Sequence, residues 1–334
     1  MRLQGLIDEL EGQRPLKWDR KVNTSQIEVV TNEGGARFKI NGDSHFSITN
    51  PCHSQIAERL ERLGKYYHKM ETEAPELLVE NINTWLKKAD KDFFIRGLGE
   101  SVRALLSDRY RVIDHLDILY CALNELQVHE AEVEECYLSE IELNIKVKSN
   151  RLRDFIRHRD DIIVGGLLLT NSETGHKALR IEPRLFRVQC TNGMVIEQFM
   201  TRQIHLGNGN NGDEADEDVY LSIRRSIREL FGRFGEIIQA LRESTEIKVR
   251  SPQKVINNVV EHYHLSEAQK ENILIAYGAE PEADMYGIAN AVTRAAQTEE
   301  RWEDSLELER IGGKLISLPA QDFRRLDEAI RMAA

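Results

Sequence analysis

The chain has 334 residues, of which 41% are hydrophobic and 30% are charged, and its formal net charge at pH 7 is -11. This composition is typical of a globular protein that folds as two domains, or as one large domain with helical additions. The negative charge argues against a uniformly basic nucleic-acid coat protein, but it leaves room for a local basic groove. Apolar runs such as 162–169 are only as long as a strand, so we expect no membrane span.

The four cysteines are scattered along the chain without a C-x-x-C pair. This spacing argues against a zinc site and against a disulfide framework. We therefore expect free thiols and a reducing compartment, the cytoplasm.

Residues 1–74 are predicted to form a mixed α/β part. Short β-branched and aromatic runs at 26–30, 37–40 and 45–48 indicate strands, and glycine-containing turns separate them. The sequence Thr49-Asn50-Pro51 then predicts the start of a helix that continues to Leu63, because proline is favoured in the first turn of a helix.

Residues 75–250 are predicted to form an α+β core. Apolar residues at helical spacing predict helices at 75–88 and 113–126, and 93–98 is expected to be a strand, whereas 100–106 is ambiguous. Residues 132–149 change to an alternating pattern with one slip, which predicts one long strand with a bulge.

The stretch 160–196 carries the clearest fold signal. An apolar run at 162–169, a polar turn at 170–175 and an alternating run at 179–188 predict a β-hairpin that continues the long strand, and Asn192-Gly193 indicates a second turn. We therefore expect an α+β fold in which an antiparallel hairpin sheet from 132–196 is packed by helices from 76–126 and 219–241.

The rest of the chain is expected to be helical after a loop. Residues 207–218 are rich in glycine, asparagine and acids, which is typical of a loop with nothing to bury. Residues 219–241 predict one amphipathic helix, weakened by Gly232 and Gly235. In the C-terminal part, 251–334, helices are predicted to begin at Pro252 and to cover 268–277, 285–296 and 322–332.

Four stretches of the chain carry a family resemblance. They are the tract 96–114 (RGL, then RALLSDRYRVID), NSETG at 171–175, CTNGM at 190–194 and NAVT at 290–293. In this order they resemble the phage/plasmid-like proteins grouped as domain of unknown function 932, over roughly residues 38–315. The resemblance implies a mobile-element gene in a bacterial host, and the family supplies no catalytic residues to transfer.

A weaker resemblance concerns the architecture alone. A helix, strands with basic edges and a long amphipathic helix are similar to the core of ring-forming single-strand annealing proteins. This likeness implies binding to single-stranded DNA and assembly of several copies.

Basic residues are in excess around the hairpin. From Lys148 to Arg187 there are nine basic residues and five acidic residues, in a chain whose net charge is negative. Arginine is well suited to bind phosphates and to stack on bases. The candidate nucleic-acid-binding residues are Lys146, Lys148, Arg151, Arg153, Arg157 and Arg159 before the hairpin, Lys177, Arg180, Arg184 and Arg187 on it, and Arg103, Arg109 and Arg111 in the first family-like tract. Alternatively, these cations form a solvated face or a structural cluster paired with local acids.

Three functions remain open at this point. The first is a protein that binds single-stranded DNA in recombination or replication, with or without strand annealing. It would bind through a continuous basic groove and form homo-oligomers. The second is a protein-interaction or anti-defence factor of a mobile element. The third is a metal-dependent nuclease, with Asp114, His115 and Asp117, or Asp160, Asp161 and Glu173, as ligands. Phosphate-loop, dinucleotide and nucleophile-elbow motifs are missing from the sequence, so we expect no enzyme, no cofactor and no metal.

Overall fold

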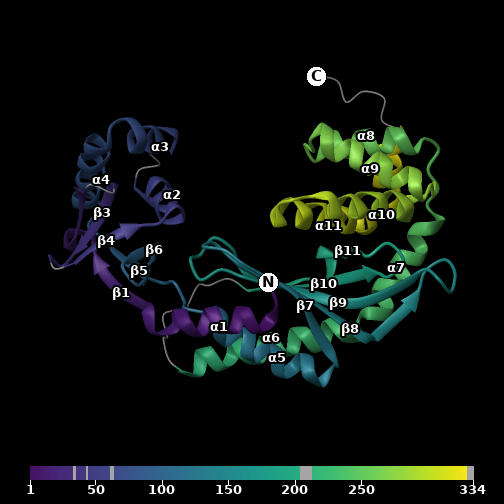
Figure 1. Ribbon diagram of the computed structural model, residues 1–334, viewed down its shortest axis with the longest axis horizontal. Helices are drawn as coiled ribbons and strands as arrows, with labels where there is room; N and C mark the ends of the chain where they lie inside the picture. The colour runs from purple at the N-terminus through teal and green to yellow at the C-terminus, as the bar shows by residue number, and fades with distance from the viewer. Residues whose placement is uncertain (33–34, 43, 61–63, 204–212, 329–334) are drawn as a thin grey trace.

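The computed structural model describes residues 1–32, 35–42, 44–60, 64–203 and 213–328. It has the α+β fold that the sequence predicts, with two sheets and a helical C-terminal part. An N-terminal lobe and a C-terminal helical lobe rise at the two ends of a central sheet, and helices α1, α5 and α6 lie beneath this sheet (Figure 1). No helix within the described ranges is both long enough and apolar enough to span a membrane.

The N-terminal lobe is built on a six-stranded sheet with the order β1-β5-β6-β4-β3-β2. Its strands are β1 (Lys17–Asn23), β2 (Ile27–Asn32), β3 (Gly35–Ile40), β4 (Ser44–Ile48), β5 (Asp92–Leu98) and β6 (Ser101–Ser107). Helices α2 (Asn50–Arg59), α3 (Gly64–Glu73) and α4 (Pro75–Ala89) complete the lobe. The sheet thus includes β5 and β6 from beyond residue 74. The three short strands predicted between 26 and 48 are confirmed.

Helix α4 protects the edge of this sheet. The Asn83 side chain accepts a hydrogen bond from the Val29 N–H (2.8 Å) and donates one to the Val29 carbonyl (2.7 Å). It therefore satisfies a β2 residue that has no neighbouring strand on that side. The prediction that α2 continues to Leu63 is wrong at its end, because the helix stops at Arg59; residues 61–63 lie outside the described residues.

The central sheet has the order β11-β10-β9-β8-β7, and β12 pairs with β10. Its strands are β7 (Ala131–Leu138), β8 (Leu143–Phe155), β9 (Ile162–Asn171), β10 (Leu179–Arg187), β11 (Asn192–Val195) and β12 (Thr201–Gln203). The predicted single strand over 132–149 is wrong, because Ser139 closes a turn to Glu142 and the chain returns as β8. The predicted bulge is present, between Val133 and Glu135.

Helices cover both faces of the central sheet. The lower face packs against α1 (Leu3–Gln13), α5 (His115–Val128) and α6 (Asp213–Gly232) through a core rich in leucine and isoleucine. Helix α4, which we expected on this sheet, instead packs on the N-terminal sheet. The predicted single helix over 219–241 is also wrong. It breaks at Arg233, between Gly232 and Gly235, into α6 and α7 (Phe234–Glu246).

Helix α6 begins earlier than we expected. Residues 213–218, which we predicted to be part of a loop, form its first turns, and 207–212 lie outside the described residues.

The C-terminal lobe consists of α8 (Pro252–His262), α9 (Glu267–Ala279), α10 (Met285–Ala295), α11 (Trp302–Ser317) and α12 (Ala320–Glu328). The helices predicted at 268–277 and 285–296 and the helix start at Pro252 are confirmed. Helix α11, which the sequence pattern does not predict, lies over the upper face of the central sheet (Figure 1). Its close approach depends on Gly313, where a Cβ atom would overlap with the Val195 carbonyl of β11.

Gly313→Ala should therefore destabilise the protein, because backbone on both sides would have to move apart to admit the methyl group. We expect a loss of about 1–3 kcal/mol in the free energy of unfolding, measured by urea denaturation. Gly5→Ala in α1 is the matched control. Nothing lies within 4 Å of its Cβ position, so it should have no cost or stabilise by about 0.5–1 kcal/mol. Equal stability of Gly313→Ala and the wild type would refute this account.

Candidate nucleic-acid interface

Helix α11 is joined to the upper face of the sheet by buried ion pairs. The Glu309 carboxylate accepts hydrogen bonds from Lys146 Nζ (3.0 Å) and from Arg184 Nε and Nη2 (3.0 Å each). Arg184 Nη1 also donates to Glu134 (2.6 Å). Burial by itself would raise the pKa of Glu309, but the charges and hydrogen bonds of Arg184 and Lys146 lower it to about 2. Two candidate DNA-binding residues thus serve as internal counter-ions.

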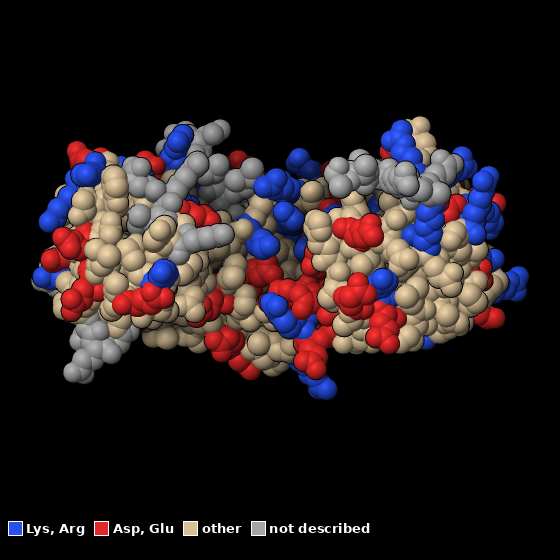
Figure 2. Space-filling model, turned by 90° about the horizontal axis from the view of Figure 1, so that it is seen from above, with Lys and Arg blue, Asp and Glu red and all other residues tan. Residues whose placement is uncertain are grey.

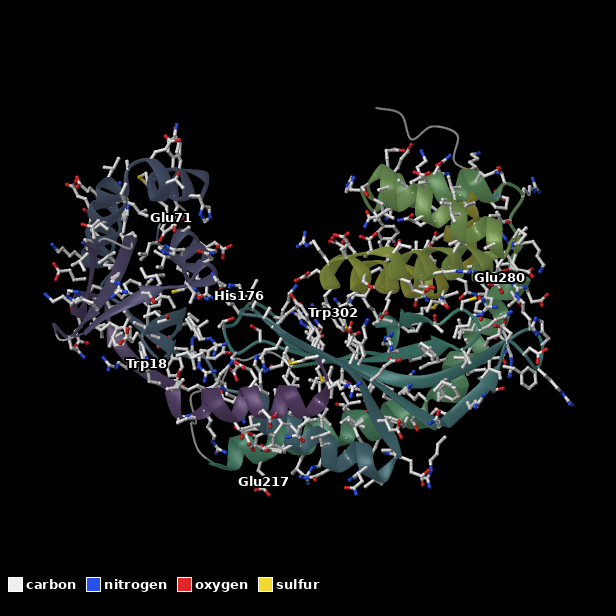
Figure 3. All side chains as sticks on the ribbon, in the orientation of Figure 1. Trp18, Glu71, His176, Glu217, Glu280 and Trp302 are labelled. Carbon is white, nitrogen blue, oxygen red and sulfur yellow. The ribbon has the colours of Figure 1, made fainter. Side chains whose placement is uncertain are left out.

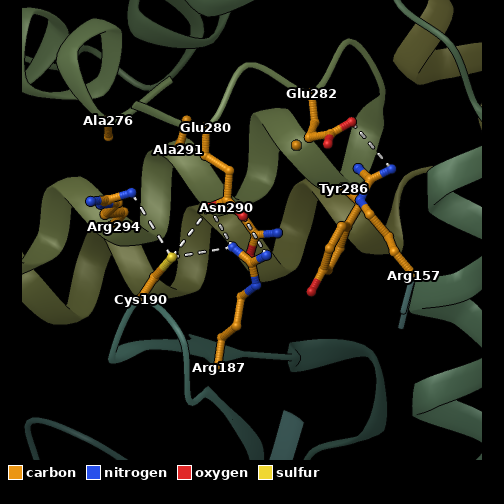
Figure 4. A pocket seen from close by; sticks show the side chains of 11 residues that line it. Arg157, Arg187, Cys190, Ala276, Glu280, Glu282, Tyr286, Asn290, Ala291 and Arg294 are labelled. Carbon is orange, nitrogen blue, oxygen red and sulfur yellow. Dashed lines mark hydrogen bonds and ion pairs between the residues drawn. The ribbon is translucent and has the colours of Figure 1, made fainter. Parts of the chain in front are cut away.

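A second buried group joins β10 and the end of β8 to the C-terminal helices (Figure 4). Arg187 donates to Asp161 (2.6 Å) and, with both terminal nitrogens, to Glu280 (2.6 Å each). Arg157 holds Asp284 in the same bidentate way, at 2.9 and 2.7 Å. The cavity beside these side chains has a volume of about 10 Å³, which is room for roughly one water molecule. This group is therefore packed as a structural joint.

A third group joins the N-terminal lobe to the turn between β9 and β10. Glu173, in this turn, accepts hydrogen bonds from Lys17 Nζ (2.6 Å), Arg103 Nη1 (3.0 Å) and the His115 backbone N–H (2.8 Å). Its own carbonyl accepts from Arg96 (3.2 Å). Burial opposes ionisation of Glu173, but the surrounding positive charges hold its pKa below the usual range. Arg103, a further candidate DNA-binding residue, is therefore also occupied within the protein.

His115 lies in the same interlobe joint and is fully buried. Burial lowers its pKa to about 4, although the charge of Glu173 acts in the opposite direction. The Asn171 side-chain amide lies 3.0 Å from His115 Nδ1, and because an amide nitrogen donates, Nδ1 accepts and carries no proton. A neutral imidazole therefore fits this position.

Cations without an acidic partner remain at the floor between the lobes. Glu182 and Arg184 of β10 contact α11 from the upper face, so Arg180, two residues earlier, lies on this face as well. It is directly opposite Arg202 of β12 in the antiparallel register. Among the described residues, neither arginine has a carboxylate within 4 Å, and Arg180 Nε is buried without a hydrogen-bond partner. Lys177, in the preceding turn, is exposed and is not paired with any described acid.

We call Lys177, Arg180 and Arg202 the basic floor. With all side chains drawn, the space above it stays open between the lobes, and His176 points into this region (Figure 3). Seen from above, the middle of the molecule has a group of Lys and Arg side chains toward one edge, and Asp and Glu side chains predominate toward the other (Figure 2). Arg202 is not among the predicted residues, because a strand of three residues is too short to show an alternating pattern.

The remaining candidates do not extend the basic floor. Arg151 is exposed and paired with Glu130 (2.6 Å), and Lys148 lies over the Phe186 ring at 5.9 Å. Arg153 and Arg159 are exposed near the turn between β8 and β9, at the opposite end of β9 from Lys177. Arg109 is exposed in the turn after β6, and Arg111 is half-buried. The candidate residues thus do not form one continuous groove, because the antiparallel strands carry the two groups to opposite ends of the sheet.

The proposed metal ligands are also separated. Asp161 is bound to Arg187 at one end of β9, whereas Glu173 is bound to Lys17 and Arg103 at the other. Within the described ranges, no group of three His, Cys, Asp or Glu side chains lies close enough to share a metal ion.

The four family-like stretches form two contacting pairs. NSETG at 171–175 contacts the tract 96–114; for example, the Tyr110 hydroxyl donates a hydrogen bond to the Glu173 carbonyl (3.1 Å). CTNGM at 190–194 contacts NAVT at 290–293, where the Asn192 amide donates to the Thr293 hydroxyl. The first pair joins the lobes and the second holds α10 on β11, so both have structural roles.

The model of the family described as "Domain of unknown function (DUF932)" matches residues 104–329. The chain belongs to this family. Comparisons with curated proteins and with solved structures give no match. In this DUF932 protein the matched range includes the central sheet, the basic floor and all of helices α8–α12, but strands β1–β5 lie outside it.

Replacement of Glu309 tests whether α11 is held by the buried carboxylate. Glu309→Gln should lower the free energy of unfolding by about 3–5 kcal/mol, because Arg184 would keep only Glu134 and Lys146 only the more distant Glu135 (3.9 Å) as acidic partners for their buried charges. Glu307→Gln in the same helix is the matched control. Since Glu307 is exposed, urea denaturation should show a change within about 0.5 kcal/mol. A similar small change for Glu309→Gln would contradict this role.

His115 predicts a pH dependence of stability. Because its folded pKa, about 4, is below its unfolded value near 6.5, the unfolded chain binds more protons between these values. Stability should therefore be fully present above pH 6.5 and fall as the pH decreases toward 4, by at most about 1.4 kcal/mol per pH unit from this group. In His115→Gln the slope of unfolding free energy against pH should be smaller in this window. The exposed His45→Gln control should keep the wild-type slope.

Proposed function

We propose that this protein binds single-stranded DNA on the basic floor between its two lobes. The observation that carries the proposal is the pair Arg180 and Arg202. Like charges directly opposite each other across two strands repel, and buried arginines elsewhere in the structure are neutralised by carboxylates. A phosphate placed between these two guanidinium groups would remove their repulsion.

The distribution of charge favours a single strand over a duplex. In the middle of the molecule, Lys and Arg side chains gather toward one edge and acidic side chains predominate toward the other (Figure 2). A duplex presents two phosphate backbones, and the second would approach the acidic side. A single strand can place its phosphates over Lys177, Arg180 and Arg202 and turn its bases away. The phage or plasmid context that the sequence resemblance implies favours DNA as the nucleic acid.

The proposal concerns binding and assigns no catalytic step. Strand annealing, a role in recombination or replication, and assembly of several copies stay predictions that follow from binding. An acidic protein partner on the same cations is the competing possibility, and the experiment below separates it from DNA.

The test is fluorescence anisotropy of a labelled single-stranded oligonucleotide at several salt concentrations. Wild-type protein should bind saturably at low salt, and the double variant Arg180→Gln/Arg202→Gln should bind at least tenfold more weakly. Because two phosphate contacts would be lost, the slope of log affinity against log salt should also decrease by about 1.4. An unlabelled duplex should compete less well than an unlabelled single strand.

Arg225→Gln is the matched control, because it removes one charge from an exposed position on α6, beneath the sheet. Its affinity should stay within about twofold of the wild type. Arg153→Gln tests the other end of the sheet and should behave in the same way. No binding by the wild type at low salt, or equal losses in all these variants, would exclude the basic floor as the DNA site.

A further inference from the structure

A separate pocket lies in the N-terminal lobe, where α2 ends against the start of β5 and the end of β6. Its volume is about 370 Å³. It is lined by Arg59, Lys91, Asp92, Phe93, Ser107 and Asp108. It shares no lining residue with the basic floor, so it needs its own explanation.

Arg59 is the unusual residue of this pocket. It is half-buried, and among the described residues it has neither an ion pair nor a side-chain hydrogen bond. Burial lowers its pKa, and the nearby Glu58 offsets this only in part. Removing a guanidinium group from water without an anion is costly. The buried Arg96 and Arg184 avoid this cost through acidic partners, whereas Arg59 has no such partner within the described ranges.

The other lining residues leave room for an anion beside Arg59. Lys91 adds a second positive charge and is held near the pocket by the Phe93 ring, 5.0 Å from its Nζ. Asp92 is exposed and accepts a hydrogen bond from Asn23 (3.1 Å), and Asp108 is exposed as well. Neither carboxylate comes within 4 Å of Arg59 or Lys91, on the described residues. Ser107 supplies a hydroxyl group at the same wall.

We propose that this pocket binds a phosphate group, with the Arg59 guanidinium as its principal contact and Lys91 and Ser107 as supporting donors. A planar guanidinium group suits two phosphate oxygens, and an ammonium group adds a point charge. The phosphate can belong to the end of a nucleic-acid strand or to a small phosphorylated molecule. The pocket is near the basic floor, because the charges of both Arg59 and Lys177 act on His176. The proposal stands without DNA binding on the basic floor.

The experiment is isothermal titration calorimetry of the full chain with inorganic phosphate, at constant ionic strength. Wild-type protein should bind one phosphate saturably, and Arg59→Gln should bind it at least tenfold more weakly. Lys91→Gln is a second variant whose exposed side chain is not needed for folding, and it should weaken binding severalfold. Arg225→Gln should leave the affinity unchanged, and thermal melts followed by circular dichroism confirm that each variant is folded.

Unchanged phosphate affinity in both Arg59→Gln and Lys91→Gln, or no saturable binding by the wild type, would overturn the proposal. The source of the phosphate follows from two oligonucleotides that differ only in a 5′-phosphate. If a strand end is the ligand, the phosphorylated form binds more tightly and Arg59→Gln abolishes the difference. If both bind equally while inorganic phosphate still binds, the ligand is a small phosphorylated molecule. The double variant Arg180→Gln/Arg202→Gln should keep the wild-type affinity for phosphate. Loss of phosphate binding in this pocket can therefore be distinguished from loss of DNA binding on the basic floor.

Discussion

The buried carboxylate of Glu309 is the interaction on which the arrangement of the upper face depends. It neutralises Lys146 and Arg184 from two strands and thereby fixes α11 on the central sheet. Since α10 packs on α11 and on β11, this contact places the C-terminal lobe together with the Arg187–Glu280 and Arg157–Asp284 pairs. The lobe in turn forms one wall of the open space above the basic floor (Figure 3).

The same principle explains which cations are free to act. Glu173 occupies Lys17 and Arg103 at the joint between the lobes, and Glu280 with Asp161 occupies Arg187. These contacts join the N-terminal lobe and the C-terminal helices to the central sheet. They also neutralise many of the basic residues counted around the hairpin. The excess of positive charge on the upper face is therefore confined to the basic floor.

The sequence predicted the local elements well where the pattern was continuous. Helix α4 follows from helical spacing and β10 from alternation, whereas β9, which is buried on both faces, follows from a continuous apolar run. It failed at Ser139 and at Arg233, because the apolar pattern continues across both breaks. The roles of Arg184 and Arg187 could not be read from the sequence, since their partners lie 125 and 93 residues away. Arg202 and Arg59 could not be predicted, because what distinguishes them from Arg184 and Arg187 is that they have no acidic partner among the described residues, and a sequence does not show such partners.

The long separation between Glu309 and its partners has a consequence during synthesis. Lys146 and Arg184 leave the ribosome 163 and 125 residues before the carboxylate that neutralises them. Until α11 emerges, the upper face of the nascent sheet leaves Lys146 open to the anionic ribosomal RNA, and Arg184 has Glu134 but not Glu309 as an acidic partner. Arrival of α11 converts that face into a buried, neutral layer, so the last part of the chain changes the electrostatic character of a surface that was made long before it.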